Sequence, residues 1–130
     1  RKAQETVSDG ALSAYPGTDV SGPTSLIHSA TKIHVNNLQS TLFNMKFSPA
    51  AIEGEAGTRK FIGLNDAYFD LGGYQVQYNV VDSKMLIDAR RHPENYGDLM
   101  VRVAGFTAKF IDLGPDVQQQ IIDRTQFDEA

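Results

Sequence analysis

The sequence predicts a single α/β domain whose parallel strands are joined by helices. Segments with strand-like and helix-like hydrophobic patterns alternate along the chain in the order β-α-β-α-β, the order that helical crossovers between parallel strands produce. A length of 130 residues fits one domain, and a hydrophobic content of 41% provides enough apolar side chains for a core.

The amino-acid composition argues against several classes of function. Sixteen Asp and Glu against twelve Lys and Arg give a net charge of −4, which argues against nucleic acid as the main partner, because such proteins usually carry a basic face. No apolar run is long enough to span a membrane, and we expect no signal peptide. Cysteine is absent, so the chain has no disulfide, no thiolate metal site and no nucleophilic thiol of its own.

The chain divides into a first segment without regular pattern and a remainder that carries the elements. Residues 1–25 combine Ser, Thr, Gly and Pro without periodicity, and we expect an extended loop segment there. Residues 26–130 carry the β/α elements. Pro23 can open the first helix, since proline is well placed at a first helical position, and the helical spacing continues to about Ile33.

The middle of the chain predicts a strand, a connection and a helix. Ser40–Phe47 alternates loosely and predicts a strand, and Ile52–Thr58 predicts a glycine-rich connection. Arg59–Leu71 predicts a helix that ends at Gly72 and Gly73. One apolar stripe of that helix consists of Phe61, Leu64, Tyr68 and Leu71.

The strand predicted over Tyr74–Val81 alternates most clearly. Its apolar face consists of Tyr74, Val76, Tyr78 and Val80, and its polar face of Gln75, Gln77 and Asn79. The polar face has two interpretations, either exposure of the sheet to water or lining of the lumen of a closed barrel.

The last third predicts two more helices around an apolar strand. Asp82 or Ser83 caps a helix to about Arg91, which His92-Pro93 ends. Leu99–Ala104 is nearly continuously apolar and predicts a strand buried on both faces. A short extended piece over Phe106–Leu113 and a helix opened by Gly114-Pro115 follow, with Val117, Ile121 and Ile122 on the inner side of that helix.

The apolar strand leads into a short motif, Arg102-Val103-Ala104-Gly105-Phe106-Thr107-Ala108, and the last helix ends in Arg124-Thr125. Both features resemble the carboxyl-terminal signature of the glycyl radical enzymes. Further similar stretches are Phe69–Asp82 and His92–Leu99. Pro16–Asp19 with Gly22–Ser25 resembles the dehydratase and carbon–heteroatom lyase branch more than pyruvate formate-lyase.

This resemblance implies a fold and a site. The chain would be the C-terminal portion of a β/α barrel, with the glycine loop inserted toward the barrel centre. Gly105 would store the radical, and Arg102, Val103, Ala104, Phe106 and Ala108 would support it as motif residues. A radical on a backbone carbon needs a planar centre, which glycine allows because it has no side chain. Such a loop should be buried away from water and dioxygen.

The family also implies partners. An S-adenosylmethionine and iron–sulfur activating enzyme would remove one hydrogen from Gly105, and no cofactor would be bound here. Turnover in the family uses a cysteine, which this chain lacks, so a larger cysteine-bearing barrel subunit or portion is expected and the chain alone would be inactive.

Three situations fit, namely a separately encoded subunit, a spare part for an oxygen-damaged enzyme, or a piece of one long polypeptide. We favour the subunit or C-terminal portion of a radical lyase or dehydratase in an anaerobic cytoplasm, with a large interface to its partner. The rival of another class is a non-catalytic α/β binding module.

Other candidate residues have simpler interpretations. Arg102 is either a surface arginine or a buried one paired with a carboxylate. His28, His34 and His92 lack the spacing of a metal site. Asp66 and Asp70 lie on one helix face that we expect to be solvated, and Gly54–Lys60 lacks the spacing of a phosphate-binding loop.

Overall fold

The computed structural model describes residues 12–34, 41–128 and 130, and its fold is α/β. Four helices and five strands are assigned within these residues, with short 3₁₀ turns at Pro49–Ile52, Pro93–Asn95 and Phe110–Asp112. In chain order the elements are α1 (Pro23–Ala30), β1 (Asn44–Phe47), α2 (Gly54–Asp70), β2 (Gln77–Val80), α3 (Ser83–Arg91), β3 (Met100–Arg102), β4 (Thr107–Lys109), α4 (Pro115–Asp123) and β5 (Gln126–Phe127).

The strands form two separate sheets. Strand β1 lies between β2 and β5 and is parallel to both. The crossover pattern predicts the parallel pairing of β1 with β2, whereas no strand was predicted at β5. Strands β3 and β4 pair only with each other and are antiparallel, so the expectation of one parallel sheet is wrong for them. The reason is length, because residues 103–106 can close a hairpin but cannot make a crossover.

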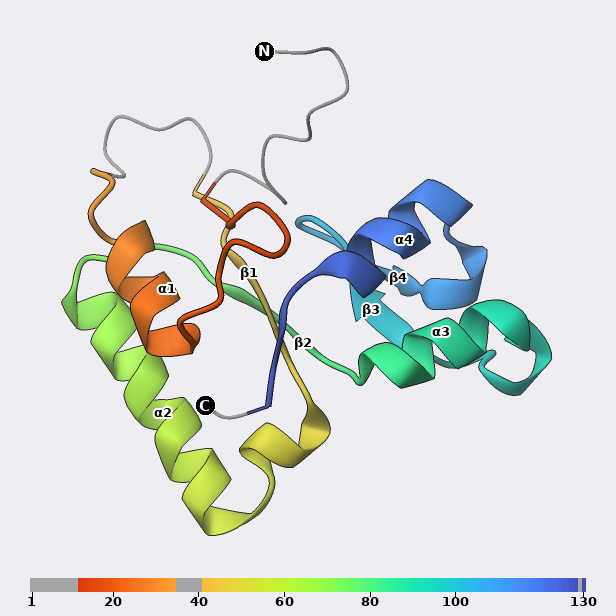
Figure 1. The fold of residues 1–130 in the computed structure, drawn as a ribbon, viewed down its shortest axis with the longest axis horizontal. Coiled ribbons are helices and arrows are strands. Elements are labelled where there is room, and N and C mark those ends of the chain that lie inside the picture. Colours follow the sequence, from red (N-terminus) through yellow and green to blue (C-terminus); the bar gives the residue numbers. More distant parts are fainter. Residues whose placement is uncertain (1–11, 35–40, 129) are drawn as a thin grey trace.

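The molecule has two halves on either side of β1 and β2 (Figure 1). Helices α1 and α2 cover one face of the three-stranded sheet, while α3, α4 and the β3–β4 hairpin lie on the other side. Each half has its own apolar cluster. The first cluster includes Ile27, Phe43, Phe47, Leu64 and Tyr68. The second consists of Val81, Leu86, Ala89, Val101, Phe110 and Ile121.

Helix α1 begins at Pro23 as predicted and buries Ile27 and Ala30. It ends at Ala30, short of the predicted end. The Thr31 side chain donates to the carbonyl oxygen of Ile27 at 3.0 Å, and Ile33 beyond it is 46% exposed. Of the predicted loop segment 1–25, residues 12–22 have turns and irregular backbone, whereas residues 23–25 already belong to α1.

Helix α2 begins earlier than the sequence suggested, because Gly54–Thr58 forms its first turns in place of a connection. A Cβ atom on Gly57 would lie 2.7 Å from the carbonyl carbon of Ile52. Glycine there lets the helix start directly against the preceding 3₁₀ turn. The inner stripe is confirmed for Phe61, Leu64 and Tyr68, whereas Leu71 is 44% exposed beyond the helix end.

The predicted glycine cap of α2 is confirmed. Gly72 has φ +88°, and the Gly73 amide donates to the carbonyl oxygen of Tyr68 at 2.8 Å. A Cβ atom on Gly73 would lie 2.5 Å from the Tyr68 ring. That ring stacks on Phe43 with centroids 5.3 Å apart, so the chain can turn back tightly toward β2 only with glycine at position 73.

Strand β2 is shorter than the predicted Tyr74–Val81, and its burial is the reverse of the usual pattern. Gln77 and Asn79 are 6% and 4% exposed, whereas Val80 is 39% and Tyr74 is 73% exposed. Gln77 and Asn79 therefore face the second half of the molecule, while Val76 and Tyr78 on the other side of β2 pack against the first apolar cluster.

The two helices of the second half agree with the sequence. The Asp82 side chain accepts a hydrogen bond from the Lys84 amide at 2.7 Å and caps α3, and α3 ends before His92-Pro93. Helix α4 opens with Pro115 and buries Ile121 completely. Strand β3 differs, because Val101 is buried whereas Met100 is 49% exposed and Arg102 half-buried, so one of its two faces is only partly covered. Instead of one extended piece over Phe106–Leu113, β4 is followed by a 3₁₀ turn.

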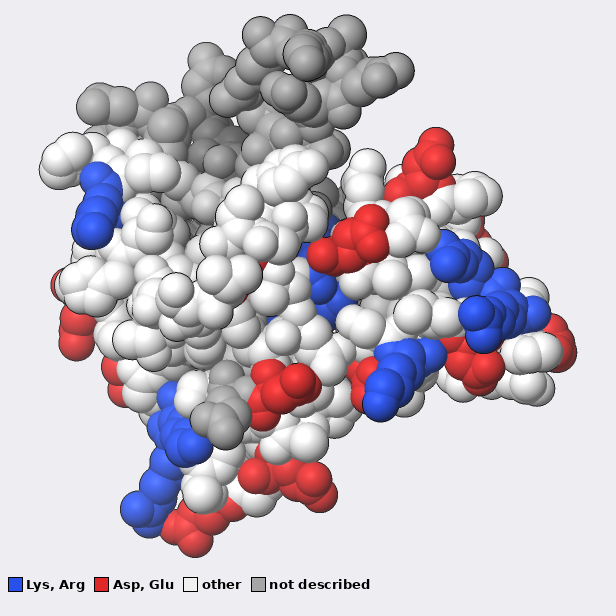
Figure 2. Space-filling model, viewed as in Figure 1, with Lys and Arg blue, Asp and Glu red and all other residues white. Residues whose placement is uncertain are grey.

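Within the described ranges, none of the helices combines the length and the apolar character needed to cross a bilayer. On the face shown in Figure 2, acidic and basic side chains lie interspersed over both halves.

Candidate functional site: a glycine hairpin on a polar layer

Polar side chains fill the space between the two apolar clusters. The parallel register pairs Asn44 with Gln77 and Lys46 with Asn79, so these side chains share one sheet face. All of them are buried. Two arginines, Arg102 of β3 and Arg124 after α4, reach the same region from the other half. We call this set the polar layer: Asn44, Lys46, Gln77, Asn79, Arg102 and Arg124.

The motif glycine lies at the tip of a hairpin formed by β3, residues 103–106 and β4, which we call the glycine hairpin. The Val103 amide donates to the carbonyl oxygen of Phe106 at 2.9 Å and closes the turn. Gly105 has φ +81°, and no other atom lies within 4 Å of the position that its Cβ would take. Backbone conformation, and not crowding, therefore favours glycine here.

Asn79 ties the base of the glycine hairpin to the sheet. Its side-chain amide nitrogen donates to the carbonyl oxygen of Arg102, and its side-chain oxygen accepts from the Arg102 amide, both at 2.7 Å. The side chain thus satisfies both backbone groups of one residue, as a neighbouring strand would. Both bonds are shielded from water, since Asn79 is buried.

Gln77 contacts the tip of the glycine hairpin. Its side-chain oxygen Oε1 accepts from the Gly105 amide at 3.1 Å and from Arg102 Nε at 2.6 Å. Arg102 also donates from Nη1 to the Thr107 hydroxyl at 3.1 Å. Arg102 is half-buried and pairs with neutral oxygens, so neither a plain surface arginine nor one paired with a carboxylate describes it.

Arg124 also holds the glycine hairpin, from the segment after α4. Its two Nη atoms donate to the carbonyl oxygens of Arg102 and Val103, at 2.9 and 2.6 Å. The side chain is 7% exposed. The planar guanidinium suits this contact because its donors diverge toward two acceptors at once.

Lys46 joins the polar layer to the end of α4. Its side chain is fully buried, and Nζ donates to Ser83 Oγ at 2.9 Å and to the carbonyl oxygens of Ile121 and Ile122 at 3.3 and 2.9 Å. These carbonyls belong to the last turn of α4, where unsatisfied acceptors and the helix dipole both favour a cation.

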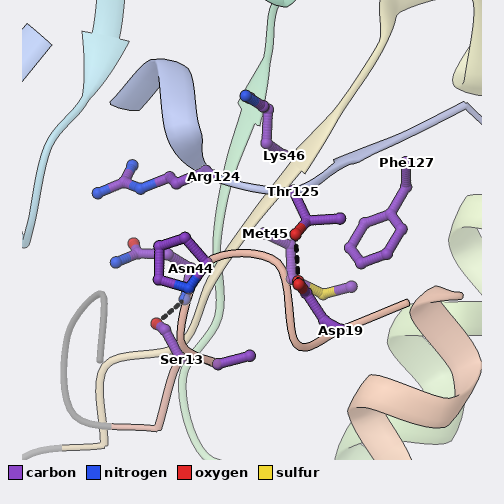
Figure 3. A pocket seen from close by; sticks show the side chains of 10 residues that line it. Ser13, Asp19, Asn44, Met45, Lys46, Arg124, Thr125 and Phe127 are labelled. Atoms are coloured by element: carbon purple, nitrogen blue, oxygen red, sulfur yellow. Dashed lines mark hydrogen bonds between the residues drawn. The ribbon is translucent and has the colours of Figure 1, made fainter. Parts of the chain in front are cut away.

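A small pocket lies beside the polar layer, between residues 13–19, β1 and residues 124–127 (Figure 3). Ser13 Oγ accepts from the Asn44 amide at 2.8 Å, and the Thr125 hydroxyl donates to the Asp19 carboxylate. In Figure 3 the Arg124 side chain extends to the left and the Lys46 side chain upward, both away from these two contacts. The loop near the amino end is thereby attached to the segment that follows α4.

The tip of the glycine hairpin is exposed in this chain. Ala104, Gly105, Phe106 and Thr107 are all exposed, and Phe106 retains 54% of its accessible surface. The described residues alone leave Gly105 uncovered, so the burial expected for this loop stays a prediction that depends on contacts outside them. Val101, from the strand before it, is buried in the second apolar cluster and leaves Gly105 uncovered.

The other sequence candidates lie apart from this site. Gln75 is exposed, and the lumen-lining role expected for Gln75, Gln77 and Asn79 stays a prediction. Asp66 and Asp70 are exposed on α2, and Gly54–Lys60 forms the start of that helix. In the part of the chain that is described, no three His, Asp or Glu residues are grouped as a metal site.

Sequence reasoning missed the contacts that hold the site. It assigned no role to Lys46, although a lysine inside the apolar run Phe43–Phe47 is unusual. It noted Arg124 only as part of the terminal motif. Which carbonyl oxygens these cations reach depends on residues distant in sequence, and no local pattern reveals them.

The fold and the site define a domain that presents a glycine backbone at the tip of a hairpin and fixes it with buried side-chain hydrogen bonds. The family model described as glycine radical matches residues 8–111. The chain belongs to this glycyl radical family.

Relatives in the family include lyases of several kinds. The chain is 52% identical over 128 residues to an indoleacetate decarboxylase of Tractidigestivibacter scatoligenes. The aligned region covers 98% of this chain and 15% of the relative. It is 44% identical to the 4-hydroxyphenylacetate decarboxylase glycyl radical subunit of Clostridioides difficile, over 98% of this chain and 14% of the relative. The chain thus spans about a seventh of the length of these relatives.

Solved structures agree with the fold. The B12-independent glycerol dehydratase from Clostridium butyricum superposes with a TM-score of 0.90 at 44% identity, covering 98% of this chain and 16% of that one. A structure on 1,2-propanediol dehydration in Roseburia inulinivorans gives a TM-score of 0.89 at 46% identity, covering 97% and 16%.

Proposed function

We propose that Gly105 stores a glycyl radical. The observation that carries this proposal is the position of Gly105 at an exposed hairpin tip, with its amide and the preceding carbonyls held by buried side chains. Activation removes one hydrogen atom, a proton with one electron, from the Gly105 Cα. The remaining unpaired electron is shared with the adjacent amide nitrogen and carbonyl group. The activating enzyme supplies the S-adenosylmethionine and iron–sulfur chemistry.

The stored radical acts through a thiol outside these residues. In the transfer step the Gly105 Cα takes a hydrogen atom from a cysteine S–H group, so that a Cα–H bond forms and a thiyl radical remains to attack the substrate. The chain contains no cysteine and spans about a seventh of its relatives. The cysteine is therefore supplied by a larger body, either a partner subunit or another part of the same enzyme.

The glycine hairpin inserts toward the centre of a β/α barrel in that larger body. An exposed tip carrying Phe106 supports this arrangement, because a radical needs shielding that this chain alone does not provide. The likeness to dehydratase structures at TM-scores of 0.89 and 0.90 also supports it.

The reaction is a radical lyase reaction. The sequence favours the dehydratase branch, and the 44% and 46% identity to dehydratase structures supports that branch. The 52% identity to indoleacetate decarboxylase supports a second candidate, decarboxylation of an arylacetate. Turnover assays of the activated enzyme with glycerol and 1,2-propanediol against indoleacetate and 4-hydroxyphenylacetate distinguish the two.

The storage of the radical is tested by paramagnetic resonance. The assembled enzyme containing this chain, activated without oxygen, should give a doublet from the remaining Gly105 α-hydrogen, and deuterium at that carbon should collapse it. Exposure to air should cleave the chain at Gly105. Gly105→Ala should abolish both, whereas Gly63→Ala in α2 should preserve both. A doublet that persists in Gly105→Ala would overturn the proposal.

A further inference from the structure

We propose that Gln77 is a positioning residue for the glycyl radical, because its side-chain oxygen accepts the Gly105 amide hydrogen and fixes the peptide plane beside the radical carbon. This inference rests on the proposed function of Gly105. The two residues are 28 positions apart, and their contact exists only because β2 passes beneath the glycine hairpin.

The acceptor, Gln77 Oε1, belongs to a buried residue of the central sheet. Gln77 is the first residue of β2 and is 6% exposed. Its backbone amide donates to the carbonyl oxygen of Phe43 at 2.8 Å, which fastens it to the central strand. Gly105, in contrast, is at an exposed tip with few contacts. The hydrogen bond of 3.1 Å therefore joins the exposed Gly105 amide to a buried acceptor that the sheet holds in place.

The orientation of the Gln77 amide is determined by its neighbours. The Gly105 amide and Arg102 Nε both donate to Oε1, and neither could pair with the NH₂ group. Thr107 in turn holds the Arg102 guanidinium at 3.1 Å. The oxygen is thus directed at the radical site by a chain of contacts within the hairpin itself.

This orientation leaves the nitrogen of the Gln77 side-chain amide without a hydrogen bond to any other described part of the chain. Gln77 Nε2 is buried and has no hydrogen-bond partner within the described residues. A buried donor without a partner is destabilising and is rare in native proteins. Stability alone would not favour glutamine at this position, whereas the need for an acceptor aimed at Gly105 explains it.

The contact has a chemical consequence. A glycyl radical is stabilised when the nitrogen lone pair and the carbonyl group are coplanar with the radical carbon. An acceptor on the N–H group holds that plane and increases electron donation from the nitrogen. Without it, the radical forms in lower yield and decays faster. Asn79 differs in role, because both ends of its amide bind the backbone of Arg102 and do not reach Gly105.

The test uses the assembled enzyme, activated without oxygen, with four variants. Gln77→Leu and Gln77→Met remove the acceptor, Gln77→Glu retains one, and Gln120→Leu is a matched control at an exposed position of α4. The spin yield, the radical half-life and the coupling of the exchangeable amide proton, seen by electron–nuclear double resonance in H₂O and D₂O, are measured. Circular dichroism and size exclusion verify folding and assembly.

Both variants remove two hydrogen bonds to Oε1, and loss of the one from the Gly105 amide, about 1 kcal/mol, corresponds to a reduction of about fivefold in yield or half-life for Gln77→Leu and Gln77→Met. The amide proton coupling should change in both, return toward the wild-type value in Gln77→Glu, and stay unchanged in Gln120→Leu. A purely structural role would leave that coupling unaltered.

The outcomes separate the two proposals. If the wild-type enzyme gives no doublet, the proposed function of Gly105 fails. If the wild type gives the doublet and the folded Gln77→Leu or Gln77→Met enzyme shows the same coupling, yield and half-life, the role of Gln77 is overturned while storage at Gly105 stands. Because methionine matches glutamine in length, Gln77→Met serves where leucine disturbs folding.

Discussion

The guanidinium of Arg124 lies 2.6 Å from the carbonyl oxygen of Val103, two residues before the motif glycine. The residue after the last helix thus holds the entrance of the glycine hairpin. The next residue, Thr125, binds Asp19 of the loop near the amino end. Through these two neighbouring residues, the segment after α4 contacts both the glycine hairpin and the loop near the amino end.

Arg124→Lys should loosen the glycine hairpin without removing the charge. A lysine cannot donate along two diverging directions to the carbonyl oxygens of Arg102 and Val103, so we expect a loss of about 1–3 kcal/mol in unfolding free energy. Amide exchange across residues 102–108 should become faster. The matched control is Arg91→Lys, at an exposed position. Equal exchange rates in both variants would contradict this role.

Lys46→Met should destabilise the junction between β1 and α4. The substitution preserves the length of the side chain but removes the donor to Ser83, Ile121 and Ile122. Because buried acceptors then lose their partner, we expect a cost of about 1–3 kcal/mol, measured by urea unfolding. Lys60→Met, on the exposed face of α2, should change stability by less than about 0.5 kcal/mol. An unchanged midpoint of urea unfolding in Lys46→Met would contradict the role of Lys46 in joining β1 to α4.

Two glycine-to-alanine substitutions should have opposite effects on stability. Gly105 has φ +81° with open space around it, so alanine costs about 1 kcal/mol of backbone strain without a clash. Gly63 lies within α2, also with open space, and alanine there should stabilise by about 0.5–1 kcal/mol. Thermal unfolding of the two variants measures the difference, and a shift in the same direction would refute the backbone explanation.

Ionisation of Tyr78 should lower the free energy of unfolding in strong alkali. Burial, with a smaller contribution from Tyr68, raises the pKa of Tyr78 from 10.0 to about 12. A raised pKa in the folded state means that the contribution is complete below pH 10 and is lost as the pH rises toward 12. Because Tyr78 is partly exposed, its contribution to the free energy of unfolding is less than about 2 kcal/mol.

In Tyr78→Phe, the decrease in unfolding free energy between pH 9 and about pH 12 should be smaller than in the wild type. Burial also raises the pKa of Tyr68, whose hydroxyl donates to the carbonyl oxygen of Gln75, so some pH dependence should remain. An unchanged pH profile in Tyr78→Phe would contradict the assignment.

Local rules anticipated much of the fold. Pro23, Asp82 and Pro115 act where the sequence placed them, and Gly72 ends α2 with a positive φ. These features follow from backbone geometry within a few residues. The start of α2 was not predicted, because a glycine-rich stretch has the same sequence pattern in a loop as in a tightly packed helix. Glycine is favoured at position 57 because a Cβ atom there would lie too close to the backbone of Ile52.

The candidate site was predicted only in part. The motif around Gly105 was visible in the sequence, whereas the polar face of β2 had two interpretations there, because Gln77 and Asn79 on alternating positions normally indicate a solvated face. Here that face is covered by the second half of the molecule, while Val76 and Tyr78 on the other face pack against the first apolar cluster, so both faces of β2 are covered.

The amino-acid order alone determined the class of elements, their main boundaries, the motif that places Gly105 at a turn, and the absence of any thiol in these 130 residues. Tertiary structure decided which groups hold that glycine. Gln77, Asn79 and Arg124 lie 21 to 28 positions from the hairpin residues that they bind. Short-range patterns report backbone preferences, whereas hydrogen-bond partners at such separations are set by how the sheet and the two apolar clusters pack together.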